Sequence, residues 1–207
     1  MTKPRRSWAI TATALALAAP IALGACVGSP GPVGNVAVPE PAKPVELNAY
    51  LGKWYEYARY EAPFQEGCEG VTADYSLKET DGRETSSASN IRVVNSCFEG
   101  SLSGKFSQAT GRARIVEGSD GAKLKVSFFG PFFGDYWVLD RSEPSADGQY
   151  EWSIVGEPSG RYLWMLTREA VPSEERRTML ETRVRELGYD WDLVRVTKQP
   201  APPEPAP

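Results

Sequence analysis

A regular alternation of apolar and polar residues marks the middle of this 207-residue sequence. In Val71–Lys78 the apolar residues occupy the odd positions and the polar residues occupy the even positions. The segments Gly111–Ile115 and Leu124–Phe128 repeat this pattern. Because successive side chains of a β-strand point to opposite faces, a period of two predicts strands with one apolar and one polar face.

Further segments rich in β-branched and aromatic residues complete a set of about eight predicted strands. They are Lys53–Tyr60, Ile91–Cys97, Tyr136–Leu139, Tyr150–Val155 and Tyr162–Thr167. Turn-forming pairs such as Asp120-Gly121 and Gly130-Pro131 separate many of the strands. Short strands at fairly even spacing predict an antiparallel sandwich or a closed barrel, and the pattern alone does not choose between them.

One helix is expected near the C-terminus. Ser173 offers an N-cap, Glu174 and Glu175 suit the positive end of the helix dipole, and Gly188 can end the helix in a left-handed conformation. Its apolar stripe consists of Leu180, Val184 and Leu187. This stripe is too narrow for a buried helix, so the helix should lie against the outside of the sheet.

The N-terminus predicts export from the cytoplasm. Three basic residues precede an uncharged apolar run, Trp8–Leu23, which Pro20 interrupts. A spanning helix needs about 20 apolar residues, whereas a basic start, a short apolar core and small residues at the end are typical of a signal peptide. The signal peptide is assigned to residues 1–25. The Arg5-Arg6 pair leaves open whether export uses the general secretory or the twin-arginine route.

The end of this segment, Leu23-Gly24-Ala25-Cys26, resembles the lipobox of bacterial lipoproteins. The resemblance implies a diacylglyceryl group on Cys26 and cleavage just before it, so that the protein is tethered to a membrane by its N-terminal lipid. The alternative is ordinary cleavage nearby, with Cys26 as a free thiol. Val27 stands where an Asp would resemble the inner-membrane retention signal, which favours the outer membrane on its periplasmic side.

Composition divides the rest of the chain. Residues 26–44, which follow from the lipidated Cys26, are rich in Pro and Gly and predict an extended stalk. Residues 45–198 form one domain of roughly 150 residues. Residues 199–207 are Pro-rich and are expected to be a disordered tail.

The charge balance excludes a nucleic-acid partner. The signal peptide contains three of the 23 Lys and Arg residues and none of the 27 Asp and Glu residues, so the mature chain carries a net charge of −7. Nucleic-acid binding asks for a basic patch. The same balance argues against strong electrostatic docking to anionic lipid, which leaves the tethering to the acyl anchor.

Two further cysteines, Cys68 and Cys97, remain in the mature chain. An even number of cysteines in an oxidising compartment predicts a disulfide, and closing a loop of roughly 30 residues contributes about 3 kcal/mol in the loop-entropy model. Two buried thiols are the alternative.

The sequence contains no histidine. Its absence excludes Ser-His-Asp and Cys-His nucleophile systems and most zinc sites, and no phosphate-binding or dinucleotide-binding glycine motif is present. We therefore expect no enzyme activity, no catalytic residue, no metal and no cofactor.

The segment Gly52-Lys53-Trp54 resembles the first signature of the lipocalin family, a Gly-x-Trp just before the first strand. Arg168, at the end of the last predicted strand, matches the family's third signature. In lipocalins these Trp and Arg side chains stack at the closed end of the barrel. Such a shielded cation–π contact contributes about 2 kcal/mol.

The similarity to bacterial lipocalins extends over nearly all of Leu51–Val196. It is carried by Lys123–Gly134, Asp135–Asp140 and Gly156–Gly160. The second family signature is only loosely kept at Leu139–Ser142. The resemblance implies an all-β fold, an eight-stranded antiparallel up-and-down barrel with one C-terminal α-helix packed outside.

It also implies a calyx that binds a small apolar ligand, a fatty acid or a lysophospholipid, for lipid transport or envelope maintenance. The expected ligand contacts are Tyr75, Val126, Phe128, Tyr136 and Trp164. Each can instead be a core residue, because a small barrel fills much of its own interior. A structural or interaction lipoprotein with a filled barrel is the alternative, and an enzyme acting on lipids is a third and weaker one. A homodimer is compatible with the sequence.

Overall fold

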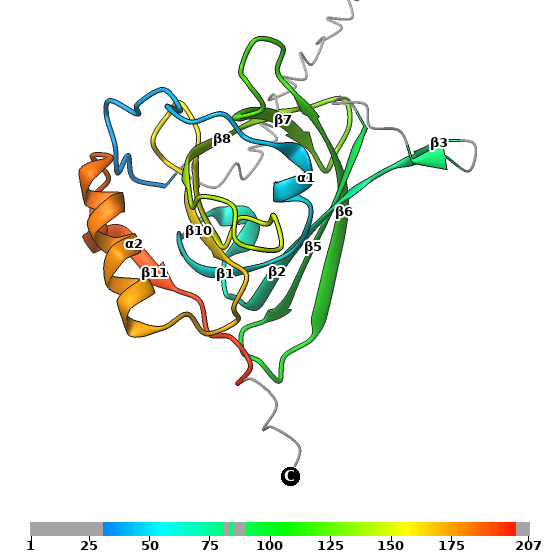
Figure 1. The fold of residues 1–207 in the computed structure, drawn as a ribbon. Coiled ribbons are helices and arrows are strands. Elements are labelled where there is room, and N and C mark those ends of the chain that lie inside the picture. The colour runs from blue at the N-terminus through cyan, green and yellow to red at the C-terminus, as the bar shows by residue number, and fades with distance from the viewer. Residues whose placement is uncertain (1–30, 81–82, 85–89, 202–207) are drawn as a thin grey trace, which may run out of the picture.

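The computed structural model describes residues 31–80, 83–84 and 90–201. Eight of its strands form one closed antiparallel barrel (Figure 1). These strands are β1 (Gly52–Tyr60), β2 (Cys68–Leu77), β5 (Ile91–Glu99), β6 (Phe106–Ile115), β7 (Lys123–Ser127), β8 (Gly134–Arg141), β9 (Trp152–Gly156) and β10 (Leu163–Thr167). Their arrangement confirms the predicted up-and-down barrel.

The pairing of β10 with β1 distinguishes the barrel from a sandwich. Tyr55 lies opposite Thr167, and Arg59 lies opposite Trp164, so the first and last strands of the ring are hydrogen-bonded neighbours. Because every strand then has a partner on both sides, the ring has no free edge. This contact joins segments more than 100 residues apart, which local alternation cannot reveal.

Several short elements were not expected. They are α1 (Leu47–Tyr50), the 3₁₀ turns η1 (Pro63–Gln65) and η2 (Trp191–Leu193), β3 (Glu79–Thr80), β4 (Arg83–Glu84) and β11 (Val194–Val196). β11 pairs with the second half of β1, where β1 and β2 have separated. β6 also begins five residues before its predicted start, because Ser107–Thr110 are polar or small and give no apolar alternation.

The two ends of the barrel differ. Helix α1 leads into β1 at one end, which we call the closed end, and it lies near the centre of Figure 1. The opposite end, here called the open end, is formed by the four loops 61–67, 100–105, 128–133 and 157–162. The two ends are therefore formed by different elements.

Helix α2 (Glu174–Glu186) packs against the outside of the barrel, as predicted (Figure 1). The Ser173 side chain accepts a hydrogen bond from the Arg176 backbone N–H, and Gly188 has φ +88°. The helix shares an outer core with the barrel wall. Its buried members include Tyr57, Leu139, Ile154, Leu163, Met165, Leu180, Val184 and Tyr189. No helix among the described residues is long and apolar enough to cross a bilayer.

Residues 31–44, which we call the N-terminal strap, are extended but lie against the barrel. At the open end, the Gly34 N–H donates to the Gly160 carbonyl at 2.9 Å. At the closed end, the Lys43 ammonium lies 3.0 Å from the Asp140 carboxylate. The Pro content explains the extended backbone, whereas the docking depends on groups that lie more than 90 residues away in the sequence. Cys26 and residues 202–207 of the expected tail lie outside the described residues.

Candidate functional site

The closed end is sealed by Trp54 and Arg168. The Trp54 side chain is fully buried, and its indole N–H donates to the Tyr50 carbonyl at 2.8 Å. The Arg168 guanidinium lies 3.7 Å from the centre of the Trp54 ring and donates to the carbonyls of Leu51 and Lys53 at 2.9 and 2.7 Å. Gly52 has φ +91°, which glycine tolerates without strain. These contacts cover the Trp54 side of the barrel at this end.

Three tyrosine hydroxyls meet at the floor of the interior. The Tyr136 hydroxyl lies 2.8 Å from the hydroxyls of both Tyr50 and Tyr75, and Tyr50 also contacts the Ser153 hydroxyl at 3.2 Å. Burial raises the pKa of Tyr50 to about 12 and raises the pKa values of Tyr75 and Tyr136 above their usual range. All three hydroxyls are therefore neutral at physiological pH, and they form an uncharged hydrogen-bonded floor.

Several inward-facing side chains in the open half of the barrel are not fully buried. Ala113 belongs to the interior core, and Ala109, on the same face of β6, is exposed. Val126, Tyr136 and Trp164 pack against that core and remain only partly buried. Because these side chains face inward, the surface that they expose lies inside the barrel, toward its mouth. Its walls are mainly apolar and aromatic, as small-molecule sites usually are.

Asn95 adds an unpaired polar group to the inward face of the barrel wall. It lies between the buried Val93 and Cys97 on the inward face of β5, opposite Ala109. Its side-chain oxygen is buried and has no hydrogen-bond partner among the described residues. A buried acceptor without a partner costs about 1–3 kcal/mol, which a donor on a ligand would offset. The sequence analysis missed Asn95, and its only signal is a polar residue at an apolar position of the alternation.

The expected ligand contacts all border the interior core. They are Tyr75, Val126, Phe128, Tyr136 and Trp164. Tyr75 and Tyr136 meet at the floor, whereas Trp164 lies near the mouth. The Trp164 indole N–H donates to the Gln65 side-chain oxygen at 3.1 Å, which ties the β1–β2 loop to the opposite strand. The mouth is therefore partly covered by η1.

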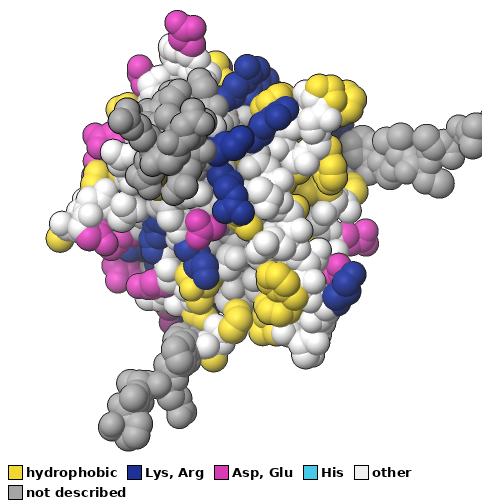
Figure 2. All heavy atoms as spheres, turned by 90° about the vertical axis from the view of Figure 1, so that its right-hand side faces the viewer, with side chains coloured by type: hydrophobic (Ala, Val, Ile, Leu, Met, Phe, Trp, Pro, Cys, Tyr) yellow, Lys and Arg dark blue, Asp and Glu magenta, His cyan; other side chains and the backbone are white. Residues whose placement is uncertain are grey.

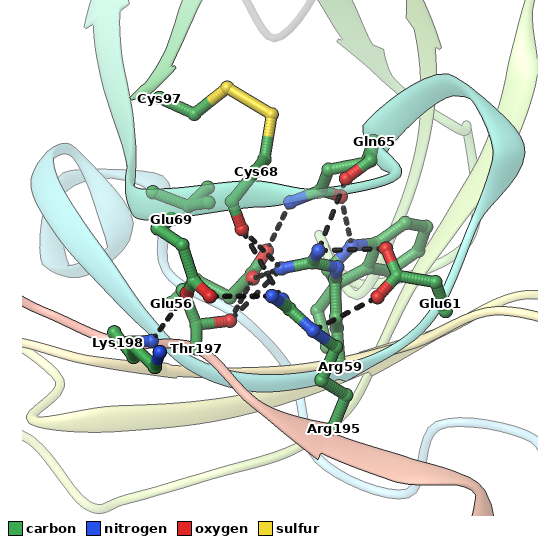
Figure 3. A network of polar contacts seen from close by, with 12 residues as sticks. Glu56, Arg59, Glu61, Gln65, Cys68, Glu69, Cys97, Arg195, Thr197 and Lys198 are labelled. Carbon is green, nitrogen blue, oxygen red and sulfur yellow. Dashed lines mark hydrogen bonds and ion pairs between the residues drawn. A yellow bond between two sulfur atoms is a disulfide. The ribbon is translucent and has the colours of Figure 1, made fainter. Parts of the chain in front are cut away.

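A charged network lies where β1 and β2 separate (Figure 3). The fully buried Arg59 donates to Glu56 at 2.7 Å and to Glu61 at 2.8 Å. Burial opposes the charge of Arg59, but Glu56 and Glu61 more than offset it, so its pKa lies above the usual value. Glu56 thus belongs to a structural ion pair.

The same network fastens the C-terminal end of the domain to the barrel. Arg195 of β11 donates to Glu69 at 2.6 Å, and the Lys198 N–H donates to the other oxygen of that carboxylate at 2.7 Å. Arg59 also donates to the Thr197 hydroxyl at 3.1 Å. These charges are paired with one another. The network therefore links β1, β2 and β11 where β1 and β2 separate.

The disulfide joins Cys68 and Cys97, with their Cα atoms 5.5 Å apart (Figure 3). It connects the start of β2 to the end of β5 at the open end. It therefore holds the wall beside Asn95. The described part of the chain brings no three His, Cys, Asp or Glu side chains into a group that could hold a metal ion.

The outer wall has a different character from the interior. Figure 2 shows the face over β5 and β6, where basic side chains form a band with apolar side chains beside it. Exposed arginines of these strands include Arg92, Arg112 and Arg114. A groove of about 570 Å³ on the outer wall is lined by Thr72, Val94 and Gln108, among others. These residues alternate with inward-facing ones, so the groove is separate from the interior.

The comparisons with known proteins agree with this geometry. The family model described as a lipocalin-like domain matches residues 45–199. The outer membrane lipoprotein Blc of Vibrio cholerae is 40% identical over 172 residues, covering 80% of this chain and 92% of that protein. Blc of Escherichia coli K12 is 35% identical over 173 residues, covering 83% and 88%. Insecticyanin from the tobacco hornworm has a similar fold, with a TM-score of 0.58 and 17% identity over 82% of this chain and 87% of its own.

Proposed function

This chain belongs to the lipocalin family, and from that membership we propose that it is a lipid-anchored carrier of a single-chain lipid, a fatty acid or a lysophospholipid. Lipocalins bind small hydrophobic ligands and are in general binding proteins rather than enzymes. The observation that carries the proposal is the set of inward-facing apolar side chains in the open half that remain exposed.

The chemistry of the interior suits a ligand with one apolar chain and one polar head. The aromatic and aliphatic walls favour burial of an acyl chain, with about 0.8 kcal/mol gained for each CH₂. The unpaired oxygen of Asn95 can accept a hydrogen bond from a hydroxyl of the head group. The tyrosine floor around Tyr136 offers further neutral hydroxyls. Two-chain lipids are less suitable, because an eight-stranded barrel holds one small ligand.

The anchor places this carrier at the outer membrane. The Leu23–Cys26 lipobox supports a diacylglyceryl group on Cys26, and the Blc relatives are outer membrane lipoproteins by name. We assign the domain to the periplasmic side, with a role in lipid transport or envelope maintenance.

A lumen-filling substitution tests the proposal. Ala109→Phe adds a ring to the inward face of β6, whereas Thr110→Phe adds the same ring to the outward face of the same strand. We expect Ala109→Phe to weaken the binding of lysophosphatidylcholine at least tenfold and Thr110→Phe to leave it unchanged. Tryptophan fluorescence titration reports the affinity, and native mass spectrometry reports the bound lipid.

Equal affinities of the two variants would place the lipid outside the barrel. A wild-type chain that binds no lysophospholipid and no fatty acid would instead favour the filled, structural barrel.

A further inference from the structure

The phenylalanines of this protein gather at one end of the barrel. All seven stand in the open-end loops or at the strand ends next to them: Phe64, Phe98, Phe106, Phe128, Phe129, Phe132 and Phe133. Three of them are largely exposed, Phe64 at 69%, Phe129 at 80% and Phe132 at 79%. Exposed aromatic side chains concentrated at one place on a protein mark an interaction surface.

The exposed rings flank the mouth from opposite sides. Phe64 lies in the β1–β2 loop, and Phe129 and Phe132 lie in the β7–β8 loop. In the ring of strands, β5 and β6 separate these loops on one side, and β9 and β10 separate them on the other. Two loops placed in this way can touch the same flat surface, which then covers the mouth.

The β7–β8 loop is held in a shape that presents its rings. The Phe132 N–H donates to the Phe129 carbonyl at 3.1 Å, which closes a turn around Gly130-Pro131 with the two rings on its first and last residues. The neighbouring Phe133 ring lies 5.2 Å from the Arg112 guanidinium and 4.9 Å from that of Arg114, on the outer wall of β6. Phe133 thus fixes the base of the loop, while Phe129 and Phe132 stay in solvent.

The N-terminal strap brings the chain to this same end. Strand β1 begins at the closed end, so a free stalk before it would place the lipid anchor there. Instead the strap runs back along the wall, and the Gly31 carbonyl accepts a hydrogen bond from Arg161 in the open-end loop 157–162. Five residue steps separate Cys26 from Gly31, which can span at most about 18 Å. The attachment point is therefore confined to the neighbourhood of the mouth.

We propose that the open end docks on the lipid bilayer, with Phe64, Phe129 and Phe132 inserted at its surface. This inference rests on the lipid attachment at Cys26 in the proposed function. The net charge of −7 of the mature chain makes an apolar contact more suitable than an electrostatic one. In this orientation the mouth faces the acyl chains of the membrane. A single-chain lipid then passes between bilayer and barrel without crossing water.

Vesicle binding tests the surface without the anchor. The mature chain carrying Cys26→Ser is mixed with vesicles of phosphatidylethanolamine and phosphatidylglycerol, and the bound fraction is measured by co-sedimentation. We expect Phe129→Ser/Phe132→Ser to lower the partition coefficient at least tenfold. Val171→Ser removes an apolar side chain that is 49% exposed at the closed end, and it should have no effect. Equal loss in both variants, or no loss in the double variant, would overturn the proposal.

Depth measurement tests the orientation in the intact lipidated protein. Phe132→Trp and Val171→Trp each add one tryptophan, at the open and the closed end, and the protein is reconstituted in vesicles of brominated phospholipid. We expect quenching of the added emission for Phe132→Trp and not for Val171→Trp. Absence of quenching at position 132 would overturn the docking even if the double serine variant failed to fold.

The two proposals fail separately. The Phe129→Ser/Phe132→Ser chain should keep the affinity of the wild type for lysophosphatidylcholine in solution, because neither ring belongs to the interior core. Loss of vesicle binding with retained ligand binding supports the docking surface. If the chain binds vesicles but takes up no lipid, the docking surface is supported and the carrier function is contradicted.

Discussion

The indole of Trp54 lies between the carbonyl of Tyr50, to which it donates, and the guanidinium of Arg168. The three residues come from helix α1, the start of β1 and the segment after β10, so one side chain joins both ends of the ring. The guanidinium has five N–H donors and is satisfied by carbonyls of the α1 region as well as by the ring face. This arrangement covers the buried Trp54 ring and pairs the indole N–H and the Arg168 guanidinium with backbone carbonyls.

Substitution of Trp54 tests this role. We expect Trp54→Ala to lower the free energy of unfolding by about 3–5 kcal/mol, because it leaves a cavity and removes the partner of the Arg168 charge. Urea denaturation measures the change. Trp191→Ala, in the partly buried turn η2, should cost less. A loss below about 1 kcal/mol for Trp54→Ala would contradict its place in the sealed end.

Asp140 connects three elements. Its carboxylate accepts hydrogen bonds from Arg183 of α2, from Lys43 of the strap and from the Arg141 backbone N–H of β8. Desolvation raises the pKa of Asp140, but the hydrogen bonds from Arg183 and Lys43 outweigh it, so the pKa lies below the usual value. The depressed value means that folding favours the ionised form.

The lowered pKa of Asp140 sets how the stability of the fold depends on pH. A carboxylate with a lowered folded-state pKa contributes stability above its unfolded pKa of about 3.9, and this stability is lost as the pH falls through the folded value. We expect Asp140→Asn to cost about 2 kcal/mol at pH 7 and markedly less in strong acid. Urea midpoints at pH 7 and at acid pH measure the difference.

The exposed Asp192 provides a control for this change. The Asp192→Asn variant should cost much less than Asp140→Asn at pH 7, because the Asp192 side chain lies at the surface. A cost of Asp140→Asn that does not depend on pH would contradict the ionised, paired state of this carboxylate.

At the scale of the whole molecule, the barrel has one sealed end and one apolar mouth, and the strap runs along the wall between them. Gly34 is bonded to Gly160 at the mouth, and Lys43 is paired with Asp140 at the sealed end. The order of these contacts determines from which end the N-terminal segment leaves the domain. A lipid on Cys26 and the exposed rings of the mouth would therefore act on the same membrane.

Removal of the lipid site tests the anchor. The chain from residue 26 onward with Cys26→Ser, fused to a leader with an ordinary cleavage site, should move from the membrane pellet to the soluble periplasmic fraction after washing. Two or three buried acyl chains on Cys26, at about 0.8 kcal/mol per CH₂, would hold the wild type on the bilayer, and a few aromatic rings would not replace them. Continued membrane fractionation of the cleaved variant would contradict lipid anchoring.

Much of the barrel was predictable because its strands depend on local patterns. The alternation in Val71–Lys78 and Leu124–Phe128 identified their strands, and the caps of helix α2 located that helix. The first half of β6 was missed, since its inward positions hold Ser107 and Ala109 instead of large apolar residues. These small residues face the interior. The segment of β6 with the least apolar alternation therefore borders the candidate site.

The sequence by itself determined most of the barrel strands, the outer helix and the lipocalin resemblance, because each depends on residues close together in the chain. Only the tertiary structure decided that β1 closes on β10, that Asn95 is left unpaired in the interior and that the strap returns to the mouth. These features depend on pairs such as Tyr55 and Thr167, which are brought together by the register of all the strands between them. The local sequence of one strand does not indicate which distant strand it pairs with. The pairing is therefore decided by the packing of the whole barrel.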